Sequence, residues 1–118
     1  MDNQLDPRFL SHDPAVVRAY VEDPLVHRRV SARWFTETTR ERESVLSRAP
    51  ELSLPLLVLQ AGDDRMVDPP SSELFYQRAG SSSKRLIVYP GFYHEIFNET
   101  EKEKALRDLE NWLANLRS

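Results

Sequence analysis

The first fifty residues carry apolar side chains at helical spacing, separated by Asp-Pro pairs. Asp13-Pro14 places an N-cap acid before a proline at the first helical position, which predicts a helix over about 14–22 that ends at Asp23-Pro24. Ser31 can cap a second helix, which has apolar and charged residues on opposite sides. Its apolar side comprises Trp34, Phe35, Thr38, Val45 and Leu46.

The pattern then changes from helix to strand. Leu56–Ala61 is apolar without alternation, as expected of a parallel strand covered on both faces, and Leu86–Tyr89 is a second run of this kind. Between them, Pro69-Pro70 starts a helix that should end at Gly80. A last helix over about 101–116 has one apolar face that should pack on the sheet. This order predicts the α/β class, with two parallel neighbouring strands.

Two parallel strands with flanking helices do not form a stable sheet, because each strand leaves an unpaired edge and an uncovered apolar face. We therefore expect an incomplete sheet that another polypeptide completes, or self-association through the free strand edge. The change of pattern divides the chain into a helical segment over residues 1–50 and an α/β segment over 51–118.

Asp64 and His94 each lie a few residues beyond the end of a predicted strand. The carboxyl ends of adjacent parallel strands meet at one edge of a sheet, so the two side chains should come together. A buried carboxylate that accepts the imidazole Nδ1 proton leaves Nε2 free to take a proton from a serine hydroxyl. The chain contains three glycines, at 62, 80 and 91, so the G-x-S-x-G turn that holds such a serine cannot be written in it.

Two segments resemble a known family at this point. Residues 58–68 and 89–99 are similar to the acid and histidine segments of the alpha/beta-hydrolase superfamily, in its monoacylglycerol lipase and lysophospholipase branch within the serine aminopeptidase-like group. Residues 10–14 and 23–27 resemble the segment that leaves the helical cap of that family. The resemblance covers nearly the whole chain and implies the C-terminal part of such an enzyme, with residues 1–50 as a cap segment.

The resemblance implies a role for particular residues. The acid falls on Asp64, with Asp63 as the alternative, and the base falls on His94. Joined to a serine that would lie upstream of Met1, the pair would cleave carboxylic esters through an acyl-enzyme, without metal or organic cofactor. The expected substrate is a small acyl ester or lipid, and the chain alone should be inactive, because the attacking group is missing.

Other candidate residues have a functional and a structural interpretation. The apolar cap residues that the resemblance places near an acyl chain are Leu25, Val26, Trp34 and Phe35, although an aromatic stripe at helical spacing also suits plain packing. His12 and His27 lack a third ligand nearby, which argues against a metal site. The serines at 71, 72 and 81–83 suit a helix start and a loop better than a nucleophile turn.

Composition removes several classes of function. Sixteen basic and nineteen acidic residues are interspersed, so no basic surface for nucleic acid is expected. The chain has no cysteine, which excludes disulfides and thiolate chemistry within it. The N-terminal sequence lacks the pattern of a signal peptide and no apolar run approaches a membrane span, so we expect a cytoplasmic protein.

Two alternatives stay open. The chain could be a non-catalytic module, a pseudoenzyme part that pairs with another chain through its sheet edge. It could also derive from a related hydrolase with an aspartate nucleophile, such as an epoxide hydrolase or a dehalogenase. Those enzymes also require an upstream nucleophile turn, so the residues present separate them from esterases only by the closer motif match.

Overall fold

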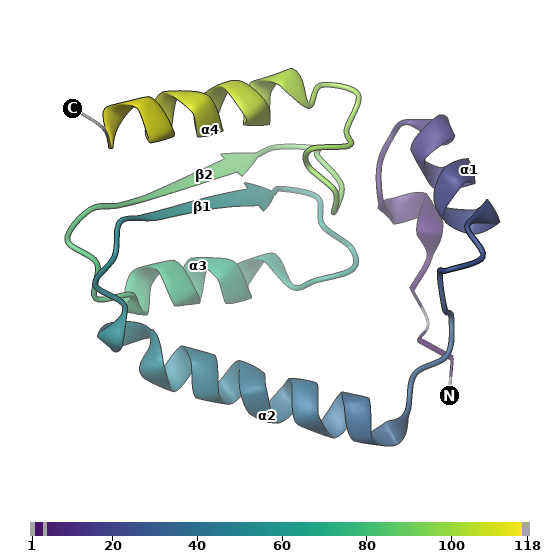
Figure 1. Cartoon of the computed structure of the whole chain (residues 1–118), viewed down its shortest axis with the longest axis horizontal. Helices are drawn as coiled ribbons and strands as arrows, with labels where there is room; N and C mark the ends of the chain where they lie inside the picture. The colour runs from purple at the N-terminus through teal and green to yellow at the C-terminus, as the bar shows by residue number, and fades with distance from the viewer. Residues whose placement is uncertain (1, 4, 117–118) are drawn as a thin grey trace.

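The computed structural model of the 118-residue chain describes residues 2–3 and 5–116 (Figure 1). Its elements, in chain order, are the 3₁₀ turn η1 (Pro7–Phe9), α1 (Pro14–Glu22), α2 (Ala32–Arg48), the 3₁₀ turn η2 (Ala49–Glu51), β1 (Leu56–Ala61), α3 (Pro69–Arg78), β2 (Lys84–Tyr89) and α4 (Glu103–Asn115). The caps predicted from the sequence are present: Asp13 accepts a hydrogen bond from Ala15 N, and Ser31 accepts one from Trp34 N.

The two strands pair in parallel, from Leu56 opposite Lys84 to Ala61 opposite Tyr89. Figure 1 shows α3 and α4 on opposite sides of this pair, with α2 beyond α3, and the strand ends directed toward α1. The predicted α/β arrangement is therefore confirmed. The helix between the strands supplies the crossover that a parallel pair requires.

Strand β2 begins two residues earlier than its apolar run predicts. Lys84 is polar, but its backbone pairs with Leu56 and its ammonium group lies 2.7–3.1 Å from the carbonyl oxygens of Tyr76, Gln77 and Ala79. These carbonyls end α3 and lack partners inside the helix. Lys84 is half-buried in β2, and its charge is compensated there because its ammonium group caps the preceding helix.

The core is small and lies where the strand ends meet α4. Its buried residues are Ala61, Tyr89, Phe92, Ile96 and Ala105, with Leu59 and Ile87 packed against them. Within the described residues, no large side chain is fully buried. Apolar surface is correspondingly exposed elsewhere in the molecule.

One edge of β1 has no strand partner among residues 2–3 and 5–116. A groove of about 560 Å³ borders this edge between α2, β1 and α3, and its apolar lining includes Val45, Leu46 and Phe75. On the α4 side a second groove is lined by residues that include Leu57 and Trp112. The sheet is therefore incomplete, as the sequence predicts.

None of the helices in the described part of the chain is long and apolar enough to cross a membrane.

Candidate active site

The loop after β1 is tied closely to the loop after β2. Gly62 N donates to Tyr89 O over 2.8 Å, and Asp63 N donates to Phe92 O over 3.0 Å. A Cβ atom at position 62 would lie 2.7 Å from Tyr89 O. Glycine at this position therefore lets the two backbones approach. The loop that follows β1 and carries Asp64 then lies against the histidine loop, residues 90–95, which follows β2 and carries His94.

A tight turn then redirects the chain after β2. Phe92 N donates to Tyr89 O over 3.2 Å, and Gly91 has φ +78°. Proline at the second position and a left-handed glycine at the third are typical of a type II turn. The turn brings His94 back toward the end of β1, where Asp64 lies.

Asp64 and His94 are hydrogen-bonded. His94 Nδ1 lies 2.9 Å from Asp64 Oδ2, and a carboxylate only accepts, so Nδ1 carries the proton. The other oxygen, Asp64 Oδ1, accepts from Met66 N and Val67 N. The Asp64 side chain is 6% exposed and that of His94 is 37% exposed. The expected contact is present, between a buried carboxylate and an imidazole that is partly open to solvent.

The environment keeps Asp64 ionised. Burial by itself raises the pKa of this carboxyl group, but the hydrogen bonds from His94 and from two backbone amides outweigh it and hold the pKa below the usual 3.8. A carboxylate in this state accepts the Nδ1 proton of the imidazole and so orients the ring.

Acid should weaken the fold through this carboxyl group. Because the pKa of Asp64 is lower in the folded chain, the unfolded chain takes up the proton more readily, so the contribution of Asp64 is present at neutral pH and is lost as the pH falls. We expect the melting temperature of the wild-type chain to fall more steeply between about pH 5 and pH 2 than that of Asp64→Asn. Calorimetric melting curves of both proteins across this pH range measure the difference in melting temperature. Parallel curves for the two proteins would contradict the prediction.

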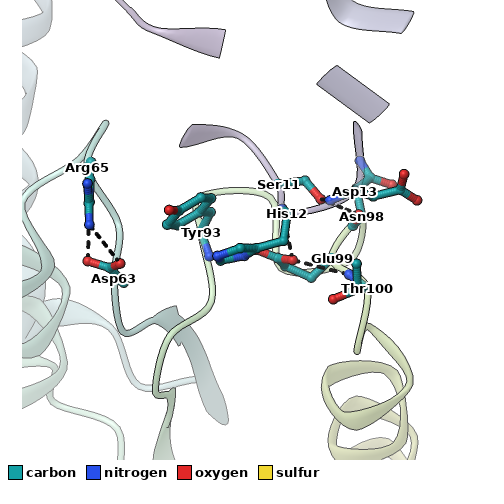
Figure 2. A network of polar contacts seen from close by, with 9 residues as sticks. All are labelled: Ser11, His12, Asp13, Asp63, Arg65, Tyr93, Asn98, Glu99 and Thr100. Carbon is teal, nitrogen blue, oxygen red and sulfur yellow. Dashed lines mark hydrogen bonds and ion pairs between the residues drawn. The ribbon is translucent and has the colours of Figure 1, made fainter. Parts of the chain in front are cut away.

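The structure separates the two candidate acids. Asp63 pairs with Arg65, whose Nη2 lies 3.2 Å from Asp63 Oδ2 (Figure 2). The Asp63 side chain is 44% exposed. Asp64, and not its neighbour, is therefore in the position to orient the His94 ring.

The apolar cap candidates lie on the surface. Leu25 is 81% exposed, Trp34 53% and Phe35 58%, while Val26 is half-buried in the connection between α1 and α2. Their exposure leaves them free to contact a substrate, and that role stays a prediction.

Ser71, Ser81 and His12 have hydrogen-bond partners other than Asp64 and His94. Ser71, in the first turn of α3, bonds to Asp68 Oδ2, and Ser81 bonds to Ser83 O within a loop. His12 contacts Glu99 through Nδ1. No group of three metal-ligating side chains occurs among the described residues.

Sequence reasoning missed the residues that support the histidine loop. Glu99 is buried and accepts hydrogen bonds from Tyr93 N and from His12. Glu99 belongs to the motif that carries the family resemblance, but no local spacing indicates that it meets a residue 87 positions away. The N-cap signal at Asp13 and the resemblance of residues 10–14 to the family were the signals that pointed to the segment around His12.

Comparisons with known proteins identify the family and the fold of this chain. The profile of the family described as serine aminopeptidase, S33, matches residues 1–101. A monoacylglycerol lipase of Mycolicibacterium smegmatis is 38% identical over 112 residues, which are 94% of this chain and 40% of the lipase. Phospholipase YtpA of Bacillus subtilis is 35% identical over 108 residues, 91% of this chain and 42% of the phospholipase. The crystal structure of Paleococcus ferrophilus monoacylglycerol lipase matches with a TM-score of 0.91 and 32% identity, over 98% of this chain and 45% of that chain.

The parallel strands, their flanking helices and these structural matches define part of an α/β-hydrolase fold. Within that fold, the chain belongs to the serine aminopeptidase, S33, family. It spans less than half the length of the three relatives described above.

Proposed function

We propose that this chain supplies the acid and the base of a serine hydrolase that cleaves carboxylic esters of lipids. The observation that carries the proposal is the hydrogen bond between Asp64 and His94 at the carboxyl ends of two adjacent parallel strands. Asp64 orients the ring and His94 acts first as general base and then as general acid.

The reaction proceeds in two steps. His94 Nε2 takes the proton of a serine hydroxyl as the serine oxygen attacks the ester carbonyl, and returns it to the departing alcohol, which leaves an acyl-enzyme. Water then attacks the acyl group, with His94 taking its proton and returning it to the serine oxygen. Neither step needs a metal or an organic cofactor.

Several features favour an acyl ester or lipid as substrate. The relatives that are 35% or more identical over the matched residues include a monoacylglycerol lipase and a phospholipase. Residues 1–50 would form a cap over the site, and its exposed apolar side chains suit an acyl chain. Leu25, Trp34 and Phe35 are exposed, and the neighbouring Val26 is half-buried. A cytoplasmic location remains a prediction of the sequence.

The nucleophile would come from a polypeptide that pairs with the free edge of β1. Apolar grooves flank this edge on both sides, with Phe75 in one and Trp112 in the other. A strand added there would bury both grooves and bring a turn at its own carboxyl end beside His94. The additional length of the relatives is sufficient for such a strand and its neighbours.

Reconstitution tests the proposal. The chain would be joined to the part of the M. smegmatis lipase that it does not match, and hydrolysis of a monoacylglycerol would be measured beside the chain alone. We expect turnover by the joined protein that is lost in His94→Ala. We expect the chain alone to hydrolyse a short p-nitrophenyl ester no faster than its own His94→Ala control. His94-dependent turnover by the chain alone, or a folded joined protein without activity, would overturn the proposal.

A second candidate is favoured by the exposed edge itself. In this alternative the chain is a non-catalytic interaction module whose β1 edge pairs with another copy or another chain. The same reconstitution separates the two functions, because a non-catalytic module would give a folded joined protein that does not hydrolyse the monoacylglycerol.

A further inference from the structure

Glu99 is a buried carboxylate to which the reaction assigns no task. Its side chain is 2% exposed, and among the described residues no arginine or lysine forms an ion pair with it. Oε1 accepts from Tyr93 N over 2.7 Å and from His12 Nδ1 over 2.9 Å. Oε2 accepts from the backbone amides of His12 and Thr100, each over 3.1 Å. A buried charge requires such a set of donors, and here the donors come from two distant segments.

These donors adjoin the base. Tyr93 immediately precedes His94, so the bond from Tyr93 N to Glu99 constrains the backbone at the point where the imidazole is attached. From the other side, His94 N donates to Phe9 O over 3.3 Å, and Glu95 N donates to Leu10 O over 2.8 Å. The histidine loop is therefore held between Glu99 and the segment 9–12.

Ring packing adds to this hold. The His12 ring stacks on Tyr93 with centroids 3.7 Å apart and planes at 19° (Figure 2). Ser11 Oγ donates to Asn98 O over 2.8 Å, next to Glu99. Glu99 therefore orients the ring that covers Tyr93 and binds the backbone beneath it, and both contacts restrict the loop that carries His94.

We propose, on the basis of the hydrolase function above, that Glu99 is the positioning residue of the base. By binding Tyr93 N and His12 together, it keeps His94 within hydrogen-bond distance of Asp64 and couples that geometry to the segment that leads into α1. His12 acts with it, as the ring that joins the two segments. Glu99 itself touches neither the substrate nor the reacting atoms.

Glu99→Gln tests this role. The glutamine has nearly the same shape, but its amide nitrogen cannot accept, so one pair of N–H donors loses its acceptor. The matched control is Glu101→Gln, because Glu101 is exposed and its ion pair, to Lys104, lies three residues away in the chain. Tyr89→Phe is the control for stability alone, because it removes the partly buried hydrogen bond from Tyr89 to Asp108, in which Glu99 and His12 take no part.

The readout requires no activity. In the full chain, NMR follows the His94 Nδ1 proton, whose signal is assigned by its loss in His94→Ala. The rate of its exchange with water is measured for each variant at the same number of degrees below the melting temperature of that variant. We expect Glu99→Gln to exchange about 10-fold faster or more, with both controls near the wild type. Unchanged exchange in a folded Glu99→Gln, or equal acceleration in Tyr89→Phe, would overturn the proposal.

A second variant keeps the test decisive if Glu99→Gln does not fold. His12→Phe keeps an aromatic ring on Tyr93 but removes the Nδ1 donor, so it should accelerate the same exchange by a smaller factor; no acceleration would overturn the proposal.

In the reconstituted hydrolase, Glu99→Gln should lower kcat by about 10- to 100-fold with little change in KM. A reconstituted protein that is inactive even as wild type would count against the hydrolase proposal, and the exchange measurement would still decide the role of Glu99.

Discussion

In the reconstituted hydrolase, Asp64→Asn is expected to lower kcat by about 10⁴-fold with little change in KM. An asparagine amide at this position can donate to Nδ1, which favours the tautomer with the proton on Nε2. That tautomer cannot accept the serine proton. Steady-state kinetics on a monoacylglycerol would measure the loss.

The matched control for Asp64→Asn is the same change one residue earlier. Asp63 is half-exposed and pairs with Arg65, so Asp63→Asn should change kcat by less than about threefold, as expected for a surface ion pair. Equal losses in the two variants would show that the geometry around Asp64 does not set the tautomer. A loss confined to Asp63→Asn would make Asp63 the acid instead.

Gly80→Ala is expected to produce the largest loss of stability of any single methyl addition to a loop of this chain. A Cβ atom at position 80 would lie 2.1 Å from Pro50 O and 3.0 Å from Pro50 C. Because both contacts are backbone atoms, the loop before β2 and the turn η2 must separate, which also strains the bond from Gly80 N to Ala49 O. We expect a loss of about 1–3 kcal/mol in the free energy of unfolding.

Urea unfolding of Gly80→Ala beside Ser82→Ala would test this expectation. Ser82 lies exposed in the same loop, so its replacement should change the free energy of unfolding by about 0.5 kcal/mol or less. A Gly80→Ala chain as stable as the Ser82 control would show that the loop and η2 separate without cost.

Gly80 also shows where local reasoning about glycine was incomplete. The sequence predicts that α3 ends at Gly80 as a helix-terminating glycine, but α3 ends at Arg78 and Ala79 is its C-cap. Gly91, and not Gly80, has the positive φ among the described residues. Gly80 is required because the chain before β2 passes against Pro50, a contact between two segments 30 positions apart.

Much of the fold was predictable because its signals are local. Asp13-Pro14 and Ser31 start helices by hydrogen bonds within one turn, and the predicted strand Leu56–Ala61 coincides with β1. Strand β2 was predicted too short, because the charged Lys84 does not belong to the apolar run. In the structure it lies in the strand because its ammonium group binds the carbonyl oxygens at the end of α3. The error lies where a side chain is satisfied by another element.

By itself, the sequence determined the parallel pair of strands, the incompleteness of the sheet and the candidacy of Asp64 and His94, because periodicity, turn residues and strand-end placement are properties of short segments. Only the tertiary structure decided that Asp64 meets His94 while Asp63 turns to Arg65, and that Glu99 joins His12 to the histidine loop. The contacts of Asp64 with His94 and of Glu99 with His12 join residues 30 and 87 positions apart, and their geometry depends on how the loops cross after the strands are paired. Adjacent carboxylates have the same chemistry along the chain, and packing alone makes one of them the partner of the base.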